Sequence, residues 1–179
     1  MDKIQEYTKT KPQLTRAVVG FCIKDGTVLL GVRKKTSLGL GLNLIAGIGG
    51  KVGDMVEFQD ETEDEALIRE MREEVGITIT SFHSVGRVNF YFPNKPKWNQ
   101  TVAIYVIDSW ESAPLETDVT LPQWFEISSP PYQQMWDDAQ YWLPIVLEGR
   151  RINASFLYGA DNTTVIDKQI EVIEENQEC

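Results

Sequence analysis

The chain has 179 residues, of which 42% are hydrophobic and 25% charged, and its formal net charge is -10. This composition excludes a disordered chain, and the length suits one globular domain over residues 1–179, since domains of roughly 100–200 residues bury most of their apolar surface. The negative charge disfavours binding to polymeric nucleic acid, where Lys and Arg contacts to phosphate supply most of the affinity.

The first part of the chain predicts two strands and a loop. Residues 14–23 are apolar and rich in β-branched side chains, and residues 28–32 form the returning strand of a hairpin across Lys24-Asp25-Gly26, where glycine tolerates a positive φ. Residues 38–50, rich in glycine and leucine, predict a flexible loop that leads into a short segment ending at Gly49-Gly50.

Residues 61–76 give the clearest helix signal. Thr62 and Glu65 have the spacing of a capping box, acidic residues fill the first turn, and Gly76 follows the last apolar position, where a helix ends. An apolar face comes from side chains that recur every four residues: Leu67, Met71 and Val75.

The remaining elements predict a mixed sheet. Strands are expected at residues 84–92, 101–110 and 123–127, with a partly helical, aromatic segment at residues 130–147. Residues 151–158 and 163–167 form a last hairpin, and the acidic tail at residues 171–179 is either helical or frayed. Strands that precede and follow one strong helix along the sequence favour a mixed sheet covered by helices.

Three glutamates of the predicted helix carry the first functional signal. Glu70, Glu73 and Glu74 are spaced i, i+3 and i+4, so their carboxylates share one face about a turn apart. These like charges repel one another, and magnesium, which prefers carboxylate oxygens, relieves the repulsion. The alternative is an ordinary solvated acidic face.

The surroundings of these glutamates resemble the Nudix family, whose signature is GX5EX7REUXEEXGU, with U a bulky aliphatic residue. From Glu61 to Ile77 the chain matches this pattern at every position, and the family's Gly-Gly-Lys-Val run is present as residues 49–52. Gly50 lies 61 − 50 = 11 residues before Glu61, whereas the signature has six, so residues 53–60 carry a five-residue insertion. Surface loops tolerate such insertions well.

This resemblance implies an α/β (α+β) Nudix fold, an α/β/α sandwich with a mixed β-sheet between helices, with its core at about residues 14–168. It implies Mg²⁺ as the cofactor, with Mn²⁺ as a substitute, held by these groups: the carbonyl of Gly49 and the carboxylates of Glu70, Glu73 and Glu74. Arg69 would orient the glutamates, Glu61 would support the preceding loop, and Glu73 or Glu74 would be the catalytic base.

A second resemblance concerns the substrate. Residues 135–144 are similar to the Met-Trp-Pro-Asp-Asp-Ser-Tyr-Trp-Phe-Pro stretch of the MutT-type oxidised purine nucleoside triphosphatases, the 8-oxo-dGTP diphosphatases, which sanitise the nucleotide pool. It implies that Trp136 stacks on the base and that Asp137 and Asp138 read its edge. The phosphates would lie near a basic and glycine-rich group: Arg33, Gly49, Gly50 and Lys51.

The chain departs from this branch at three positions. Ala46 stands where the family uses an asparagine that contacts the base, Ala139 takes the second aspartate position, and Val119 replaces a glutamate near the metal site. A polar partner missing from a pocket changes discrimination between substrates by orders of magnitude. Two alternatives therefore stay open, a Nudix hydrolase for ADP-ribose or a dinucleoside polyphosphate and a non-catalytic, nucleotide-sensing Nudix domain.

The rest of the sequence offers few other signals. Cys22 and Cys179 predict neither a disulfide nor a zinc site, and His83 is expected to be structural. The polar start resembles no signal peptide, and no run of about 18 apolar residues occurs. We expect a cytoplasmic monomer or homodimer whose partner is a small nucleotide, not a membrane.

Overall fold

The structure is a computed structural model that describes residues 2–34 and 44–174. In this part of the chain, nine strands and three α-helices are present. The strands are β1 (Thr15–Lys24), β2 (Thr27–Arg33), β3 (Ile45–Ala46), β4 (Ile48–Lys51), β5 (Thr78–Tyr91), β6 (Gln100–Glu111), β7 (Thr120–Glu126), β8 (Arg151–Tyr158) and β9 (Val165–Ile173). The helices are α1 (Lys3–Thr8), α2 (Glu63–Val75) and α3 (Ala139–Leu147), with short 3-10 turns at Val56–Phe58, Pro96–Trp98 and Tyr132–Gln134.

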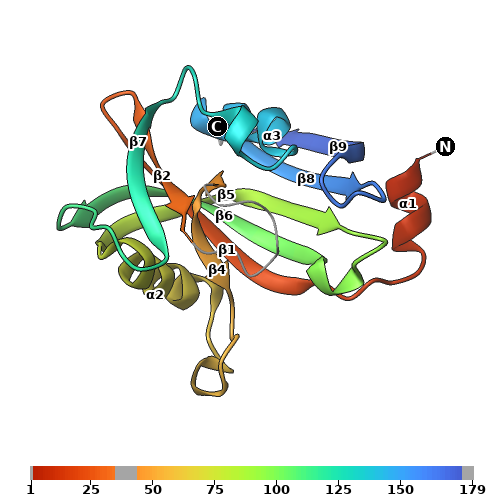
Figure 1. The fold of residues 1–179 in the computed structure, drawn as a ribbon, viewed down its shortest axis with the longest axis horizontal. Helices are drawn as coiled ribbons and strands as arrows, with labels where there is room; N and C mark the ends of the chain where they lie inside the picture. Colours follow the sequence, from red (N-terminus) through yellow and green to blue (C-terminus); the bar gives the residue numbers. More distant parts are fainter. Residues whose placement is uncertain (1, 35–43, 175–179) are drawn as a thin grey trace, which may run out of the picture.

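The strands form a mixed sheet in the order β3-β2-β1-β6-β5-β8-β9 (Figure 1). β1 runs parallel to β6, and β5 runs parallel to β8, whereas the other pairs are antiparallel. Two strands lie off this path, since β4 pairs with β1 and β7 pairs with β2. The pairing between β1 and β4 sets Val19 opposite Gly49 and therefore brings the glycine run to the centre of the sheet.

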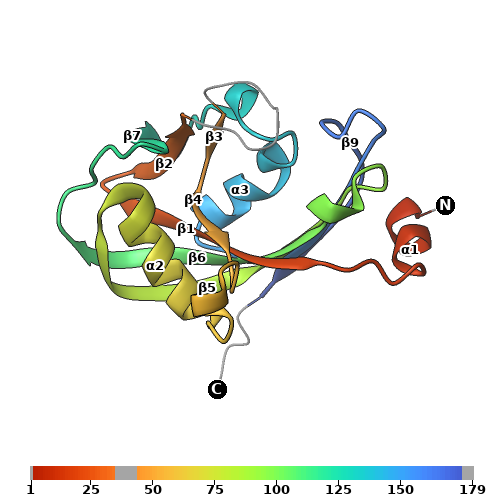
Figure 2. The same cartoon turned by 60° about the horizontal axis from the view of Figure 1, so that its bottom comes forward.

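Helices cover both faces of the sheet. α2 packs on one face, where its buried Leu67 and Met71 join Val18 and Cys22 of β1. α3 packs on the opposite face, where Trp142 and Leu143 contact the cluster that contains Phe21. Figure 2 shows α2 and α3 separated by strands β1 and β6. The predicted sandwich, with a mixed sheet between helices, is confirmed.

The helix predicted at residues 61–76 is confirmed as α2, with Thr62 and Gly76 as its caps. The strands expected in the first and last parts of the chain are also present, although β5 begins at Thr78, before its predicted start. The predicted loop at residues 38–50 falls partly outside the described residues, and its later part contains β3 and β4. No described helix has the length and apolar character needed to span a membrane.

One helix was not predicted, and one prediction was wrong. The polar start, where no element was predicted, contains helix α1, because Asp2 caps it and Ile4 is buried against Tyr91 and Leu157. Residues 171–173 of the acidic tail are neither helical nor frayed, because they belong to β9 and pair with β8. Residues 175–179 of that tail lie outside the described residues.

Candidate active site

Helix α2 presents its glutamates to the sheet because local signals set its position. Thr62 and Glu65 form the reciprocal hydrogen bonds of a capping box at its start. At its end, Gly76 adopts a left-handed conformation with φ of 71° and donates its N–H to the carbonyl of Arg72. Both ends of α2 are therefore capped. The side of the helix that carries Glu70 and Glu74 lies against β4, where Gly50 is next to the Glu70 carboxylate.

Glycines of β4 allow the helix to approach the backbone of the sheet. A side chain at Gly49 would collide with the carbonyl of Val18 on the paired strand β1. A side chain at Gly50 would occupy the space of the Glu70 carboxylate. The Gly49-Gly50 pair therefore leaves room for strand pairing on one side and for a carboxylate on the other.

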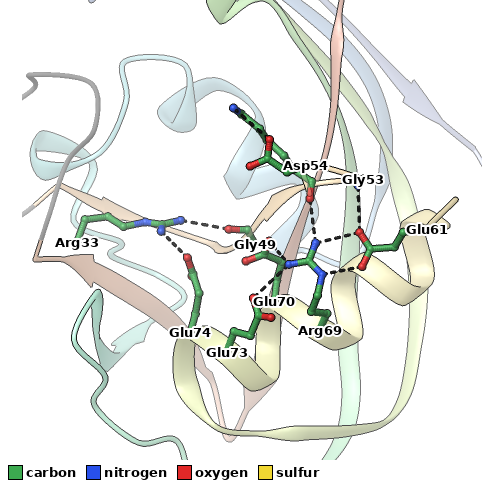
Figure 3. Close-up of polar contacts among 10 residues, drawn as sticks. Arg33, Gly49, Gly53, Asp54, Glu61, Arg69, Glu70, Glu73 and Glu74 are labelled. Carbon is green, nitrogen blue, oxygen red and sulfur yellow. Dashed lines mark hydrogen bonds and ion pairs between the residues drawn. The ribbon is translucent and has the colours of Figure 1, made fainter. Parts of the chain in front are cut away.

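Arg69 holds the carboxylates of three glutamates in a network that Figure 3 shows. Its guanidinium donates to Glu61 through Nε at 2.6 Å and through a terminal nitrogen at 2.9 Å, which makes a bidentate pair. The same group donates to Glu70 at 2.8 Å, to Glu73 at 3.2 Å and to the carbonyl of Lys51 at 3.0 Å. The network fixes the relative placement of the glutamates.

Glu61 also reaches the loop before the helix, because its carboxylate accepts a hydrogen bond from the N–H of Gly53 at 3.1 Å. This contact joins the first glutamate of the signature to the segment that contains the insertion.

Glu74 is the buried carboxylate of the site. It pairs with the guanidinium of Arg33, which also donates to the carbonyl of Gly49 at 3.3 Å (Figure 3). Burial raises the pKa of Glu74 to about 7, against the opposing effect of the Arg33 charge. Burial likewise raises the pKa of Glu70, although its hydrogen bond with Arg69 opposes the shift.

The donor set of this site suits a hard divalent cation. Its groups are all oxygens, and Oε2 of Glu74 is buried without a hydrogen-bond partner among the described residues, which is costly unless a cation or a donor satisfies it. Within residues 2–34 and 44–174, no three Asp, Glu, His or Cys side chains converge on one point. The glutamates of the site pair instead with Arg33 and Arg69. The guanidinium of Arg33 thus supplies the positive charge between Gly49 and Glu74.

A cavity of about 300 Å³ lies on the α3 face of the sheet and extends to the edge of the glutamate site. Alternate side chains of β1, β5 and β6, together with Phe92 just after β5, form its floor: Ala17, Val19, Phe21, Val88, Phe90, Phe92, Gln100, Val102 and Ile104. Arg33, Gly49, Gly50 and Lys51 line the same cavity, and the glycines also contact the glutamate helix. An apolar compartment therefore adjoins a charged one.

The segment before α3 supplies another wall of the cavity. Trp136 lines it and packs edge-on against Phe92 and Tyr158, with centroid distances of 6.0 and 5.8 Å. Asp138 also lines it, but this residue is only 4% exposed and accepts hydrogen bonds from Trp142 Nε1 at 2.6 Å and from the Tyr158 hydroxyl. Both oxygens of Asp138 thus hold the aromatic wall.

The remaining predicted residues lie elsewhere. Asp137 is not among the residues that line the cavity, since its carboxylate accepts the N–H of Val165 at 2.8 Å and the amide of Gln140 at 2.9 Å. His83 lies on β5 and its ring pairs with Asp108 at 2.8 Å. Val119 is 39% exposed.

Sequence reasoning missed most of the cavity floor. The alternation of Val88, Phe90 and Phe92 in the strand predicted at residues 84–92 was a usable signal for a shared face. Gln100 carried no such signal. It is the polar member of the floor.

Comparison with known proteins identifies the family. The family profile described as NUDIX domain matches residues 12–144. The chain belongs to the Nudix family. It is a Nudix hydrolase, and the family is generally dependent on divalent metal ions.

Two related Nudix proteins carry the name oxidized purine nucleoside triphosphate hydrolase. The protein from Danio rerio is 35% identical over 150 residues, which cover 84% of this chain and 90% of that protein. The protein from Mus musculus is 30% identical over 147 residues, with coverage of 82% and 88%. Among solved structures, the MutT protein from Bacillus halodurans matches 88% of this chain and 98% of its own with a TM-score of 0.72, and its 19% identity makes this a likeness of fold alone.

Proposed function

We propose that this Nudix hydrolase is a magnesium-dependent nucleoside triphosphate pyrophosphohydrolase acting on oxidised purine nucleotides such as 8-oxo-dGTP. The observation that carries the proposal is that the glutamate site and the apolar cavity share a wall. This wall contains Gly49 and Gly50, which separate the glutamates of α2 from the cavity. A nucleotide has the same division, with a flat base at one end and a charged phosphate chain at the other. The names of the Danio rerio and Mus musculus relatives support the same substrate class.

The base would occupy the apolar cavity. Trp136 offers a π-face, and stacking on an aromatic side chain stabilises a bound base by about 1–3 kcal/mol. Gln100 offers an amide NH₂ group and a carbonyl oxygen to the polar rim of a base, and the carboxyl group of Asp138, whose oxygens also accept from Trp142 and Tyr158, lines the same cavity. Ala46 and Ala139 leave two wall positions without hydrogen-bonding side chains, so recognition of the base would rest on fewer polar contacts.

The phosphates would lie at the charged end. Arg33 and Lys51 line the cavity beside the glycine run and would contact phosphate oxygens. The carbonyl of Gly49 and the carboxylates of Glu70, Glu73 and Glu74 would hold Mg²⁺. When bound, Mg²⁺ would supply charge neutralisation for the phosphates and a lowered pKa for a water molecule.

Glu73 is the best-placed catalytic base. Its side chain is 55% exposed, whereas those of Glu70 and Glu74 are 13% and 8% exposed, so Glu73 is the one that a water molecule reaches most easily. The water would attack a phosphorus of the triphosphate chain, its proton would pass to Glu73, and the bond to the bridging oxygen would break. The products would be a nucleoside monophosphate and pyrophosphate.

Incubation of the purified protein with Mg²⁺ and a substrate panel tests the proposal. The panel contains the four dNTPs, 8-oxo-dGTP, 2-oxo-dATP, ADP-ribose and a diadenosine polyphosphate, with separate quantification of pyrophosphate, orthophosphate and nucleotide products. The proposal predicts that an oxidised purine triphosphate has the highest kcat/KM and yields a monophosphate and pyrophosphate. A higher kcat/KM for ADP-ribose or the dinucleotide would contradict the substrate assignment while leaving the family unchanged.

A further inference from the structure

The inserted segment before α2 returns to the glutamate site at both of its ends. At its start, the N–H of Gly53 donates to the Glu61 carboxylate at 3.1 Å, and near its end the N–H of Glu61 donates to the carbonyl of Phe58 at 2.9 Å. Between them the chain turns through a short 3-10 helix, in which Phe58 donates its N–H to Met55 at 2.9 Å. The insertion is therefore anchored on the residue that pairs with Arg69.

This turn directs an aromatic ring onto Arg69. The centroid of the Phe58 ring lies 4.8 Å from the central carbon of the Arg69 guanidinium, within the range of a cation–π contact. By contrast, the side chain of Val56 in the same turn is 92% exposed. Within the turn, Phe58 is thus the side chain that faces the site.

The contacts of Arg69 explain why this ring matters. Donors around the edge of the guanidinium plane reach Glu61, Glu70, Glu73 and the carbonyl of Lys51. The face of the plane is the part that these hydrogen bonds leave open, and Phe58 covers it. The Arg69 side chain, with these partners around its edge and Phe58 over its face, is only 15% exposed.

We propose that Phe58 is a positioning residue, which acts through Arg69 to hold Glu70 and Glu73 in place for the metal. The proposal rests on the proposed metal-binding role of these glutamates. Without the ring, water reaches the guanidinium face, the effective dielectric constant around the ion pairs rises, and Arg69 gains freedom to rotate. Arg69, the common anchor that sets the separation of the glutamates, is then held less rigidly.

Direct measurement of metal binding tests this role without any substrate. Free Mn²⁺ is quantified by electron paramagnetic resonance during titration of wild type, Phe58→Leu, Phe58→Tyr and Phe58→Met. Leu and Met keep apolar bulk but lack a π-face, whereas Tyr keeps the face. We expect Mn²⁺ affinity about two- to five-fold weaker for Phe58→Leu and Phe58→Met, and close to wild type for Phe58→Tyr. Val56→Ala, in the same turn, serves as the matched control and keeps wild-type affinity.

Thermal unfolding shows whether each variant is folded. If Phe58→Leu does not fold, Phe58→Met takes its place in the comparison. Equal Mn²⁺ affinity in wild type and the folded Leu or Met variant would overturn the role of Phe58 alone. Failure of wild type to bind Mn²⁺ would overturn the proposed metal role and this inference with it. The Mn²⁺ titration contains no nucleotide. An error in the substrate assignment is therefore distinguishable from a failure of the role proposed for Phe58.

Discussion

Replacement of Asp138 tests how the aromatic wall of the cavity is held. Asp138 is 4% exposed, and its carboxyl group accepts hydrogen bonds from Trp142 and Tyr158, whose ring stacks on Phe92 at 4.4 Å. Asp138→Leu removes both acceptors and leaves two buried donors without partners. Asp138→Asn keeps one oxygen for the indole N–H of Trp142 and can donate its amide to the Tyr158 hydroxyl oxygen.

The expected losses follow from these contacts. An unsatisfied buried donor costs about 1–3 kcal/mol, so the two donors left by Asp138→Leu should lower the free energy of unfolding by roughly 2–6 kcal/mol. Asp138→Asn, with its partners rearranged but present, should lower it by about 1 kcal/mol. Urea unfolding at constant pH, followed by tryptophan fluorescence, measures both values, and exposed Asp118→Asn is the control. Equal stability of wild type and Asp138→Leu would refute the account of the wall.

The same pair of proteins gives a pH test. Burial raises the pKa of Asp138 above its ordinary value, against the opposing effect of its hydrogen bonds with Tyr158 and Trp142. The unfolded state therefore loses the Asp138 proton first as the pH rises, and the contribution of Asp138 to the stability of wild type falls from about pH 4 upward until the folded pKa is passed. Asparagine has no proton to lose, so the advantage of wild type over Asp138→Asn should shrink with rising pH. A constant difference between pH 4 and pH 8 would contradict the raised pKa.

Three further substitutions test the cavity and the glycine run. Trp136→Ala should raise KM for a purine triphosphate by about ten-fold or more with little change in kcat, because it removes a stacking surface that stabilises the base by about 1–3 kcal/mol; steady-state kinetics measures the two constants separately. Gln100→Leu should reduce the ratio of kcat/KM for 8-oxo-dGTP over dGTP by about ten-fold, since it removes a polar group from the floor; competition between the two substrates gives this ratio. Gly49→Ala should lower the thermal unfolding midpoint and the activity together, because its methyl group collides with the Val18 carbonyl; calorimetry and turnover test this.

The glutamate helix was predictable because its signals are local. Thr62, Glu65 and Gly76 set the ends of α2, and the spacing of Glu70 and Glu73 places them on one face whatever the rest of the fold does. Helix α1 was missed for the opposite reason. Its six residues are stabilised by the burial of Ile4 against partners more than 80 positions away, which no local pattern reveals.

The candidate site also combines features set by local sequence with features set by contacts between distant residues. The signature spacing identified Arg69 and its glutamates, but the pairing of Arg33 with Glu74 joins residues 41 positions apart and depends on the β2 and β4 geometry. The stacking of Phe58 on Arg69 depends on the path of an insertion that the signature lacks. The partners of Asp138 show that an acidic residue expected to read a base edge also holds the cavity wall.

Turnover by Glu73→Gln tests the central claim most directly. The protein is assayed with 8-oxo-dGTP at increasing Mg²⁺ concentrations, beside wild type and the control Glu111→Gln, whose exposed carboxylate lies on β6 away from the site. The account predicts that wild type and Glu111→Gln release pyrophosphate only with Mg²⁺, and that Glu73→Gln loses about two to four orders of magnitude in kcat while remaining folded. Undiminished pyrophosphate release by Glu73→Gln, or wild-type turnover that persists in EDTA, would contradict it.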